Sequence, residues 1–113
     1  MRIQDLSERI GARIVSGEAT LEVSIDGVCA GDRISDLLAQ ASSSCLLVTN
    51  LVGPSLLRVA ELMDVPAICL VGGMEVEPVM KKTAEQQGLV LLVSPCDMFE
   101  TCGRLYRALK DEA

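Results

Sequence analysis

The sequence predicts an α/β protein of three layers, in which a mostly parallel sheet lies between helices. Three short apolar runs, at residues 45–49, 67–71 and 89–93, carry this prediction. Runs of this length and uniformity are typical of strands covered on both faces, as in a parallel sheet. Each run leads into a helical pattern through a short link, which implies right-handed crossovers. A small N-terminal helix and short mixed strands precede these three units. We expect residues 1–113 to form a single domain.

The chain begins with a predicted short helix over residues 4–10. Leu6 and Ile10 are four residues apart and therefore share one face of it. Gly11 is placed to end this helix, as glycine does just past a helix end. Residues 13–15 then predict a short strand.

The next segment has a weaker pattern. Apolar residues alternate loosely over residues 21–30, which indicates a half-buried strand. The Asp26–Gly27 pair breaks the alternation, so two short strands are the alternative. Ser35 is placed to cap a helix over residues 36–41, and serines 42–44 predict a loop.

Two prolines mark the starts of the next two helices. Pro54 predicts a helix that runs to about residue 63, with an apolar face made of Leu56, Val59, Ala60 and Met63. Pro78 predicts the other, with Val79, Thr83 and Ala84 on its inner side. Gly88 is expected to end that helix.

The last predicted helix follows the third strand. Ser94 is placed to cap it, with Pro95 next and Asp97 three residues on. Its apolar positions occur at helical spacing: Phe99, Cys102, Leu105, Tyr106 and Leu109. Gly103 costs about 1 kcal/mol relative to alanine inside a helix, which predicts close packing against a neighbour.

Composition excludes several classes of function. Hydrophobic residues make up 50% of the chain, yet it has one Phe, one Tyr and no Trp, so the core must be aliphatic. The absence of histidine removes the commonest general base and zinc ligand. A net charge of −6 and the scarcity of aromatic residues argue against nucleic acid as a partner. We expect no metal and no cofactor.

The five cysteines are interpreted as core thiols. No pair has C-x-x-C spacing, and several lie in apolar runs, where Cys behaves as a small hydrophobe. Free thiols are typical of a reducing cytosol. The N-terminus lacks the apolar segment of a signal peptide, and polar residues interrupt the longest uncharged stretch. We therefore expect a cytoplasmic protein without a membrane span.

A resemblance to a known family rests on the order of several short motifs. They are Ile25-Asp26-Gly27-Val28, Gly31-Asp32, Ser35-Asp36-Leu37-Leu38, Leu47-Val48-Thr49, Ile68 to Gly73, Ser94 to Glu100 and Gly103-Arg104-Leu105-Tyr106. In this order they resemble the DRTGG domain, a module related to the N-terminal domain of bacterial HPr kinase/phosphorylase. The likeness covers most of the chain.

The resemblance implies a regulatory, ligand-sensing or assembly module rather than an independent enzyme. Such domains occur alone or fused to larger proteins, including phosphotransacetylases and regulated pyrophosphatases. The sequence departs from the family pattern in two ways, and these limit what the resemblance implies. The contiguous Asp-Arg-Thr-Gly-Gly string is absent, with only Gly72–Gly73 and, less firmly, Asp32 matching. The G-x-x-x-x-G-K-[ST] phosphate loop of the related kinases is also absent, so their activity does not carry over.

The candidate ligand site is the carboxyl edge of the predicted sheet, since ligands of open α/β sheets bind outside those strand ends. The residues expected to gather there are Thr49, Asn50, Gly53, Gly72, Gly73, Met74 and Ser94. Helix N-termini beside them would suit an adenine nucleotide, a phosphorylated metabolite or another anion. The alternative is that the glycines only satisfy turn geometry and Ser94 only caps a helix, because no nearby Lys or Arg is evident.

Three functional hypotheses remain. The first is a non-catalytic regulatory module that acts as a homodimer or higher homo-oligomer, with Leu51, Val52, Met74 and Val76 as residues that either line an interface or enter the core. The second is the small-molecule binder just described. The third, a hydrolase or kinase, lacks support, because serines 42–44 have no evident base. Asp26, Asp32 and Asp36 fit a metal cluster or, more simply, turn and cap roles.

Overall fold

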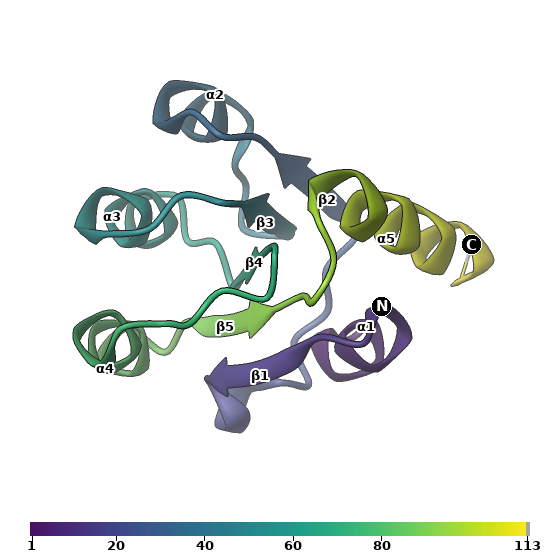
Figure 1. Cartoon of the computed structure of the whole chain (residues 1–113), viewed down its shortest axis with the longest axis horizontal. Coiled ribbons are helices and arrows are strands. Elements are labelled where there is room, and N and C mark those ends of the chain that lie inside the picture. Colours follow the sequence, from purple (N-terminus) through teal and green to yellow (C-terminus); the bar gives the residue numbers. More distant parts are fainter. Residues whose placement is uncertain (113) are drawn as a thin grey trace.

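The computed structural model describes residues 1–112 as a five-stranded sheet with helices on both faces (Figure 1). The elements in chain order are α1 (Ile3–Ile10), β1 (Arg13–Ser16), the 3-10 helix η1 (Glu18–Thr20), β2 (Gly27–Ala30), α2 (Ile34–Gln40), β3 (Cys45–Thr49), α3 (Pro54–Leu62), β4 (Ala67–Leu70), α4 (Pro78–Gln87), β5 (Val90–Val93) and α5 (Met98–Glu112). The predicted α/β class is confirmed.

The sheet has the strand order β1-β5-β4-β3-β2. Strands β2 to β5 are parallel, and β1 pairs antiparallel with β5. The prediction of a mostly parallel sheet with short mixed strands is therefore confirmed, and β4 is its middle strand. The antiparallel β1 places its first residue, Arg13, opposite the last residue of β5, Val93.

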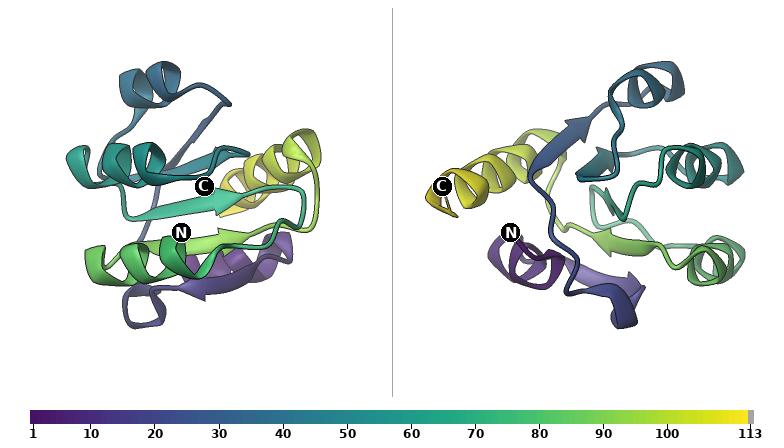
Figure 2. Two further views of the ribbon diagram at one scale, coloured as in Figure 1. Left: turned by 60° about the vertical axis from the view of Figure 1, so that its left-hand side comes forward. Right: turned by 180° about the vertical axis from the view of Figure 1, so that it is seen from behind.

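Helices α2, α3 and α4 cover one face of the sheet, and α1 and α5 cover the other (Figures 1 and 2). Two apolar clusters fill the space between these layers. Successive residues of β4 alternate between them: Ile68 and Leu70 enter the first cluster, and Ala67 and Cys69 enter the second. A strand buried on both faces needs apolar residues at every position, which explains the uniform runs in the sequence.

The prediction for residues 21–30 is only partly right, because the strand is limited to Gly27–Ala30. The carbonyl groups of the backbone before this strand accept hydrogen bonds from the first residues of α1 instead. The N–H of Ile3 donates to the carbonyl oxygen of Val23 at 2.9 Å, and the N–H of Gln4 donates to that of Leu21 at 3.1 Å. Because these carbonyls satisfy the first free N–H groups of a helix, the alternating pattern here does not produce a longer strand.

Two predicted caps are wrong. Ser35 lies inside α2, whose N-cap residue is Arg33. Ser94 is buried, and the cap of α5 is Asp97, whose Oδ1 accepts a hydrogen bond from the N–H of Glu100 at 2.9 Å. The rule that a short polar side chain caps a helix holds for α5. The sequence pattern placed that cap three residues too early.

Two predicted inner faces also need correction. On α4, Val79 is exposed, and the buried residues are Met80 and Ala84. On α5, Phe99 is 86% exposed and Tyr106 is 68% exposed, while Thr101, Leu105 and Ala108 form the buried side. Both helices carry apolar residues over more than one face, so spacing alone did not identify which face the sheet covers.

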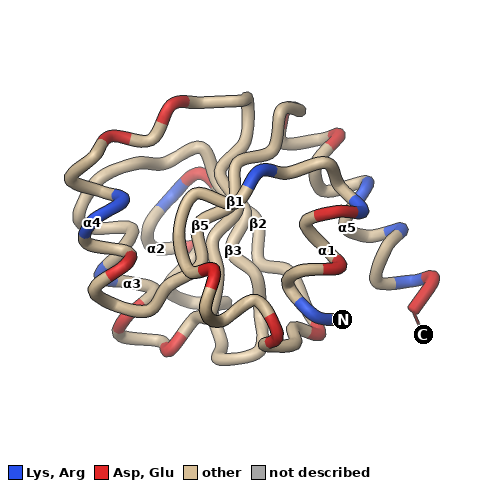
Figure 3. Tube along the Cα trace, turned by 90° about the horizontal axis from the view of Figure 1, so that it is seen from below, with Lys and Arg blue, Asp and Glu red and all other residues tan. Residues whose placement is uncertain are grey.

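Charged residues lie on the helices and connecting loops around a sheet that carries few of them (Figure 3). Four surface ion pairs join side chains at 3.5 Å or less, among them Arg2 with Asp5 and Arg9 with Asp111. Within residues 1–112, no helix is both long enough and apolar enough to cross a bilayer.

Candidate functional site

The carboxyl ends of β3 and β5 are followed by buried hydroxyl groups that hold the loops in place. The Thr49 hydroxyl accepts a hydrogen bond from the N–H of Leu51 at 3.1 Å. The Ser94 hydroxyl lies 2.7 Å from that of Thr101 and accepts from the N–H of Cys96 at 3.2 Å. Thr49 and Ser94 are both fully buried. Their roles in this structure are therefore to fix the loops at the sheet edge.

The two glycines after β4 form a loop that is locked to the loop after β5. Gly72 and Gly73 have φ values of 80° and 62°, a conformation that favours glycine. Their N–H groups donate to the carbonyl oxygens of Cys96 and Ser94 at 2.7 and 2.8 Å. These N–H groups are thus already engaged within the chain. The positive φ values of this turn are sufficient to explain glycine at both positions.

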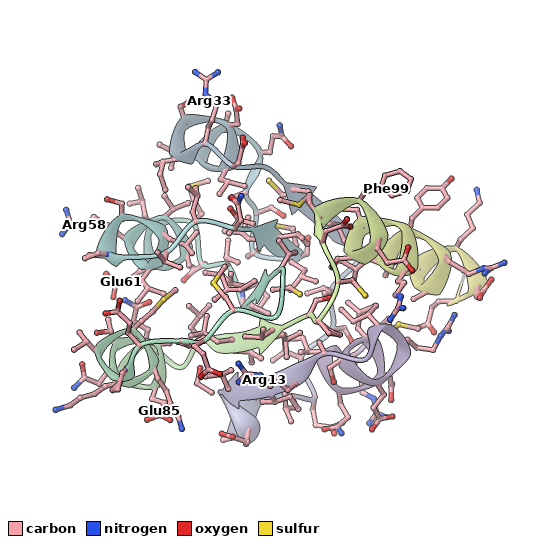
Figure 4. All side chains as sticks on the ribbon, in the orientation of Figure 1. Arg13, Arg33, Arg58, Glu61, Glu85 and Phe99 are labelled. Atoms are coloured by element: carbon pink, nitrogen blue, oxygen red, sulfur yellow. The ribbon has the colours of Figure 1, made fainter. Side chains whose placement is uncertain are left out.

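A basic residue that sequence reasoning missed lies at the same edge. The Arg13 Nη2 donates to the carbonyl oxygen of Met74 at 2.9 Å, and the Arg13 side chain is exposed. Arg13, labelled in Figure 4, is the first residue of β1 and pairs with the last residue of β5, Val93. Sequence reasoning did not find it because Arg13 lies 61 residues from Met74 and reaches it only through the antiparallel pairing of β1.

A groove with a volume of about 810 Å³ lies between α3 and α4 and reaches this edge of the sheet. We call it the α3–α4 groove. It is lined by Asn50, Val52, Gly53, Pro54, Leu57, Arg58, Glu61, Met74, Glu75, Val76, Glu77, Val79, Met80, Thr83 and Gln87. Of the seven predicted site residues, it brings together Asn50, Gly53 and Met74. Gly72 and Gly73 are exposed outside this lining, and Thr49 and Ser94 are buried.

The groove has an apolar floor and an acidic rim. Leu57 and Met80 are buried, whereas Val52 and Val79 are exposed at its mouth. One basic side chain, Arg58, lines it together with three carboxylates, those of Glu61, Glu75 and Glu77. Figure 4 shows Arg58 extending outward from α3 and Glu61 on the side of α3 that faces α4. This charge pattern favours a neutral or singly charged ligand over a polyanion.

One of the residues that line the groove, Gln87, has a buried side-chain oxygen without a hydrogen-bond partner in the described part of the chain. The Oε1 of Gln87 is buried and accepts no hydrogen bond from residues 1–112. A buried acceptor without a donor is costly, and such groups in native structures call for an explanation. A ligand that donates an N–H or O–H to Gln87 would satisfy it. Sequence reasoning had no signal for Gln87, because it is the last residue of α4 and lies far along that helix from the predicted edge.

The apolar residues suspected of lining an interface divide between groove and core. Leu51, Met74 and Val76 are partly buried and pack against the first apolar cluster. Val52 is exposed at the groove.

The cysteines have the properties of core thiols. All five are free; Cys29, Cys45 and Cys69 are buried. Burial raises the pKa of Cys69 to about 12, and it also raises the pKa of Cys29 and of Cys102. A raised pKa keeps these three thiols protonated at neutral pH, which lowers their nucleophilicity. Among residues 1–112, no three His, Cys, Asp or Glu side chains converge in a way that could hold a metal ion.

Comparison with known proteins gives a structural likeness. No protein-family model matches the chain, and no curated protein sequence matches it significantly. Among solved structures it is similar to the CBS and DRTGG domains of the regulatory region of Clostridium perfringens pyrophosphatase, a crystal structure in complex with the activator diadenosine tetraphosphate. The TM-score is 0.71 and the sequence identity is 11%. The match covers 92% of this chain but spans only 45% of that chain. At this identity the likeness establishes a shared α/β fold.

Proposed function

We propose that the chain is a non-catalytic, cytoplasmic regulatory module of the DRTGG type, which senses a small ligand in the α3–α4 groove and acts as a homo-oligomer. The observation that carries the ligand part is the groove itself, which opens at the carboxyl edge of a parallel sheet and extends along α4 to Gln87, whose Oε1 is unpartnered within the described residues. The order of sequence motifs supports the family assignment, as does the fold shared with a structure that contains a DRTGG domain.

A non-catalytic role is supported by the engagement of the candidate nucleophiles. The hydroxyls of Thr49 and Ser94 are buried in loop hydrogen bonds. The thiols of Cys29, Cys69 and Cys102 have raised pKa values. The similar pyrophosphatase structure is that of a regulatory region. Free buried thiols also suit the reducing cytoplasm.

An adenine nucleotide is the ligand class we favour. The similar structure contains diadenosine tetraphosphate as an activator, and the apolar floor of the α3–α4 groove suits the adenine part of such a ligand, whereas its acidic rim disfavours a long phosphate chain. An adenine ring would lie against Leu57 and Met80, and its exocyclic amino group would donate to Gln87 Oε1. A phosphate would lie toward Arg58. The acidic rim predicts that adenosine and AMP bind better than ATP, because each added phosphate raises the repulsion.

The test is a thermal-shift series with adenosine, AMP, ATP and inorganic phosphate. We expect adenosine or AMP to raise the melting temperature of the wild-type protein, with a smaller effect of ATP and none of phosphate. Gln87→Leu should abolish the shift while keeping the fold, because it removes an unsatisfied acceptor. Gln86→Leu, at an exposed neighbouring position, is the matched control and should keep the shift.

Two results would contradict the ligand proposal. One is that none of the four compounds changes the melting temperature. The other is that phosphate alone produces the shift and Gln87→Leu leaves it intact, which would assign recognition to an anion site instead.

A further inference from the structure

The two aromatic side chains of the protein both lie on the surface of α5. The chain has one Phe and one Tyr, and these are 86% and 68% exposed. Figure 4 shows Phe99 pointing away from the rest of the molecule. Aromatic residues are enriched at protein interfaces, where they contribute large apolar areas. In a protein whose core is aliphatic, their placement on one outer face is a feature that the isolated chain does not explain.

Gly103 lies on the same face of α5, between the two aromatic residues. Phe99, Gly103, Tyr106 and Lys110 follow one another at spacings of four, three and four, which aligns them along the helix. We call them the outer stripe. A Cβ added to Gly103 would meet no atom of residues 1–112 within 4 Å. The packing that the sequence predicted at this glycine is therefore not supplied by the other elements of residues 1–112. Close approach by another backbone would explain a glycine inside a helix.

An apolar hollow continues the outer stripe onto the sheet. It has a volume of about 480 Å³ and lies between α5 and β2. Its lining consists of Val28, Ala30, Cys102, Tyr106, Leu109 and Lys110. Strand β2 is an edge strand of the sheet, and Val28 and Ala30 are exposed on it. The outer stripe and this hollow share Tyr106 and Lys110, so the two surfaces adjoin.

The charges beside the outer stripe are arranged for self-complementarity. Glu100 and Arg107 lie seven residues apart on the same flank, one residue after Phe99 and Tyr106 respectively; Gly103 is three residues after Glu100 and four before Arg107, and Glu100 also lies 3.5 Å from Arg104 on this flank. If two α5 helices cross antiparallel at Gly103, Glu100 of each copy faces Arg107 of the other. The helix dipoles are then also antiparallel, which is favourable. A two-fold axis through the crossing point produces both contacts at once.

We infer that the outer stripe and the β2 hollow form the interface of a two-fold homodimer, in which the α5 helices of two copies cross antiparallel at Gly103. The aromatic side chains of each copy pack beside the crossing, and the Glu100–Arg107 pairs fix the orientation. This inference rests on the homo-oligomer part of the proposed function and assigns its surface and symmetry. It is independent of the ligand in the α3–α4 groove, which lies on the other face of the sheet.

The decisive experiment uses charge reversal and mixing, followed by analytical ultracentrifugation. We expect the wild-type protein to sediment at twice the chain mass of 12.1 kDa. Glu100→Arg alone and Arg107→Glu alone should each weaken the dimer about tenfold or more, since like charges then face each other. An equimolar mixture of these two variants should recover the dimer, because every facing pair is again of opposite charge. An interface elsewhere on the surface would show neither the loss in the single variants nor the recovery in their mixture.

Gly103→Leu tests the crossing point. The position is open, so this variant should keep its helical circular dichroism and its melting cooperativity while losing the dimer. Leu62→Ser removes an exposed apolar side chain from α3, on the opposite layer, and is the matched control that should remain dimeric.

The possible failures are distinguishable. A wild-type protein that is monomeric at high concentration overturns both this inference and the homo-oligomer part of the proposed function. A wild-type oligomer that survives Gly103→Leu and both charge reversals overturns the interface alone. Neither result bears on the thermal shift produced by ligands in the groove.

Discussion

Gly17→Ala is the substitution for which the structure makes the sharpest prediction. Gly17 follows β1 and has a φ of 86°, in the left-handed region. A Cβ at this position would lie 2.7 Å from the Cα of Val90 and 3.0 Å from the carbonyl oxygen of Leu89. Two of its close neighbours are thus backbone atoms at the start of β5, which cannot move without disturbing the sheet.

The expected cost has two parts. An alanine in the left-handed region is unfavourable by about 1–2 kcal/mol. Forcing extra volume into a packed site costs about 1–3 kcal/mol more. Gly17→Ala should therefore lower the free energy of unfolding by about 2–5 kcal/mol, a large part of the total stability of about 5–15 kcal/mol that is typical of a domain.

Urea denaturation followed by circular dichroism measures this loss, and Gly88→Ala provides the control. Gly88 ends α4 with a φ of 71°, but a Cβ there meets no atom of residues 1–112 within 4 Å. Gly88→Ala should lower the free energy of unfolding only by the cost of an alanine in the left-handed region, about 1–2 kcal/mol. If the two variants are equally stable, the close approach of Gly17 to β5 does not have the consequence that we assign to it.

Two further predictions concern buried polar and ionisable groups. Thr101→Val removes the hydroxyl that lies 2.7 Å from that of Ser94, and urea denaturation should show a loss of about 1–3 kcal/mol, against a few tenths for Thr83→Val on the more accessible α4. The pKa of Cys69 is raised by burial from 9.0 to about 12, so the folded state keeps this proton after the unfolded state has lost it. The contribution of the Cys69 thiol to the free energy of unfolding is therefore fully present below pH 9. It falls by about 1.4 kcal/mol per pH unit between pH 9 and pH 12. The free energy of unfolding, measured by urea denaturation between pH 9 and pH 12, should fall less steeply with pH for Cys69→Ala than for the wild-type protein. Equal slopes would refute the raised pKa of Cys69.

The strands of the sheet's centre could be predicted from the sequence because their signals are local. A strand buried on both faces requires apolar residues at successive positions, and the runs that became β3, β4 and β5 show this without reference to any partner. Pro54 and Pro78 mark helix starts for an equally local reason, since their fixed φ and missing N–H suit the first helical position.

The candidate site was only partly predictable because it depends on contacts between distant segments. The prediction placed Asn50, Gly53 and Met74 at a common edge from strand ends alone, and these three do line the groove. Arg13 reaches that edge through a strand pairing, and Gln87 reaches the groove through the packing of α4 against α3.

The sequence by itself thus determined the fold class, the central strands and the starts of α3 and α4, since each follows from residues adjacent in the chain. Only the tertiary structure decided which side of α5 is buried and which apolar residues remain exposed. Phe99, Leu105 and Tyr106 all suit an inner helical face by their spacing, yet only Leu105 contacts the core. Spacing specifies that residues share a face, whereas burial depends on how the helix is oriented against the sheet.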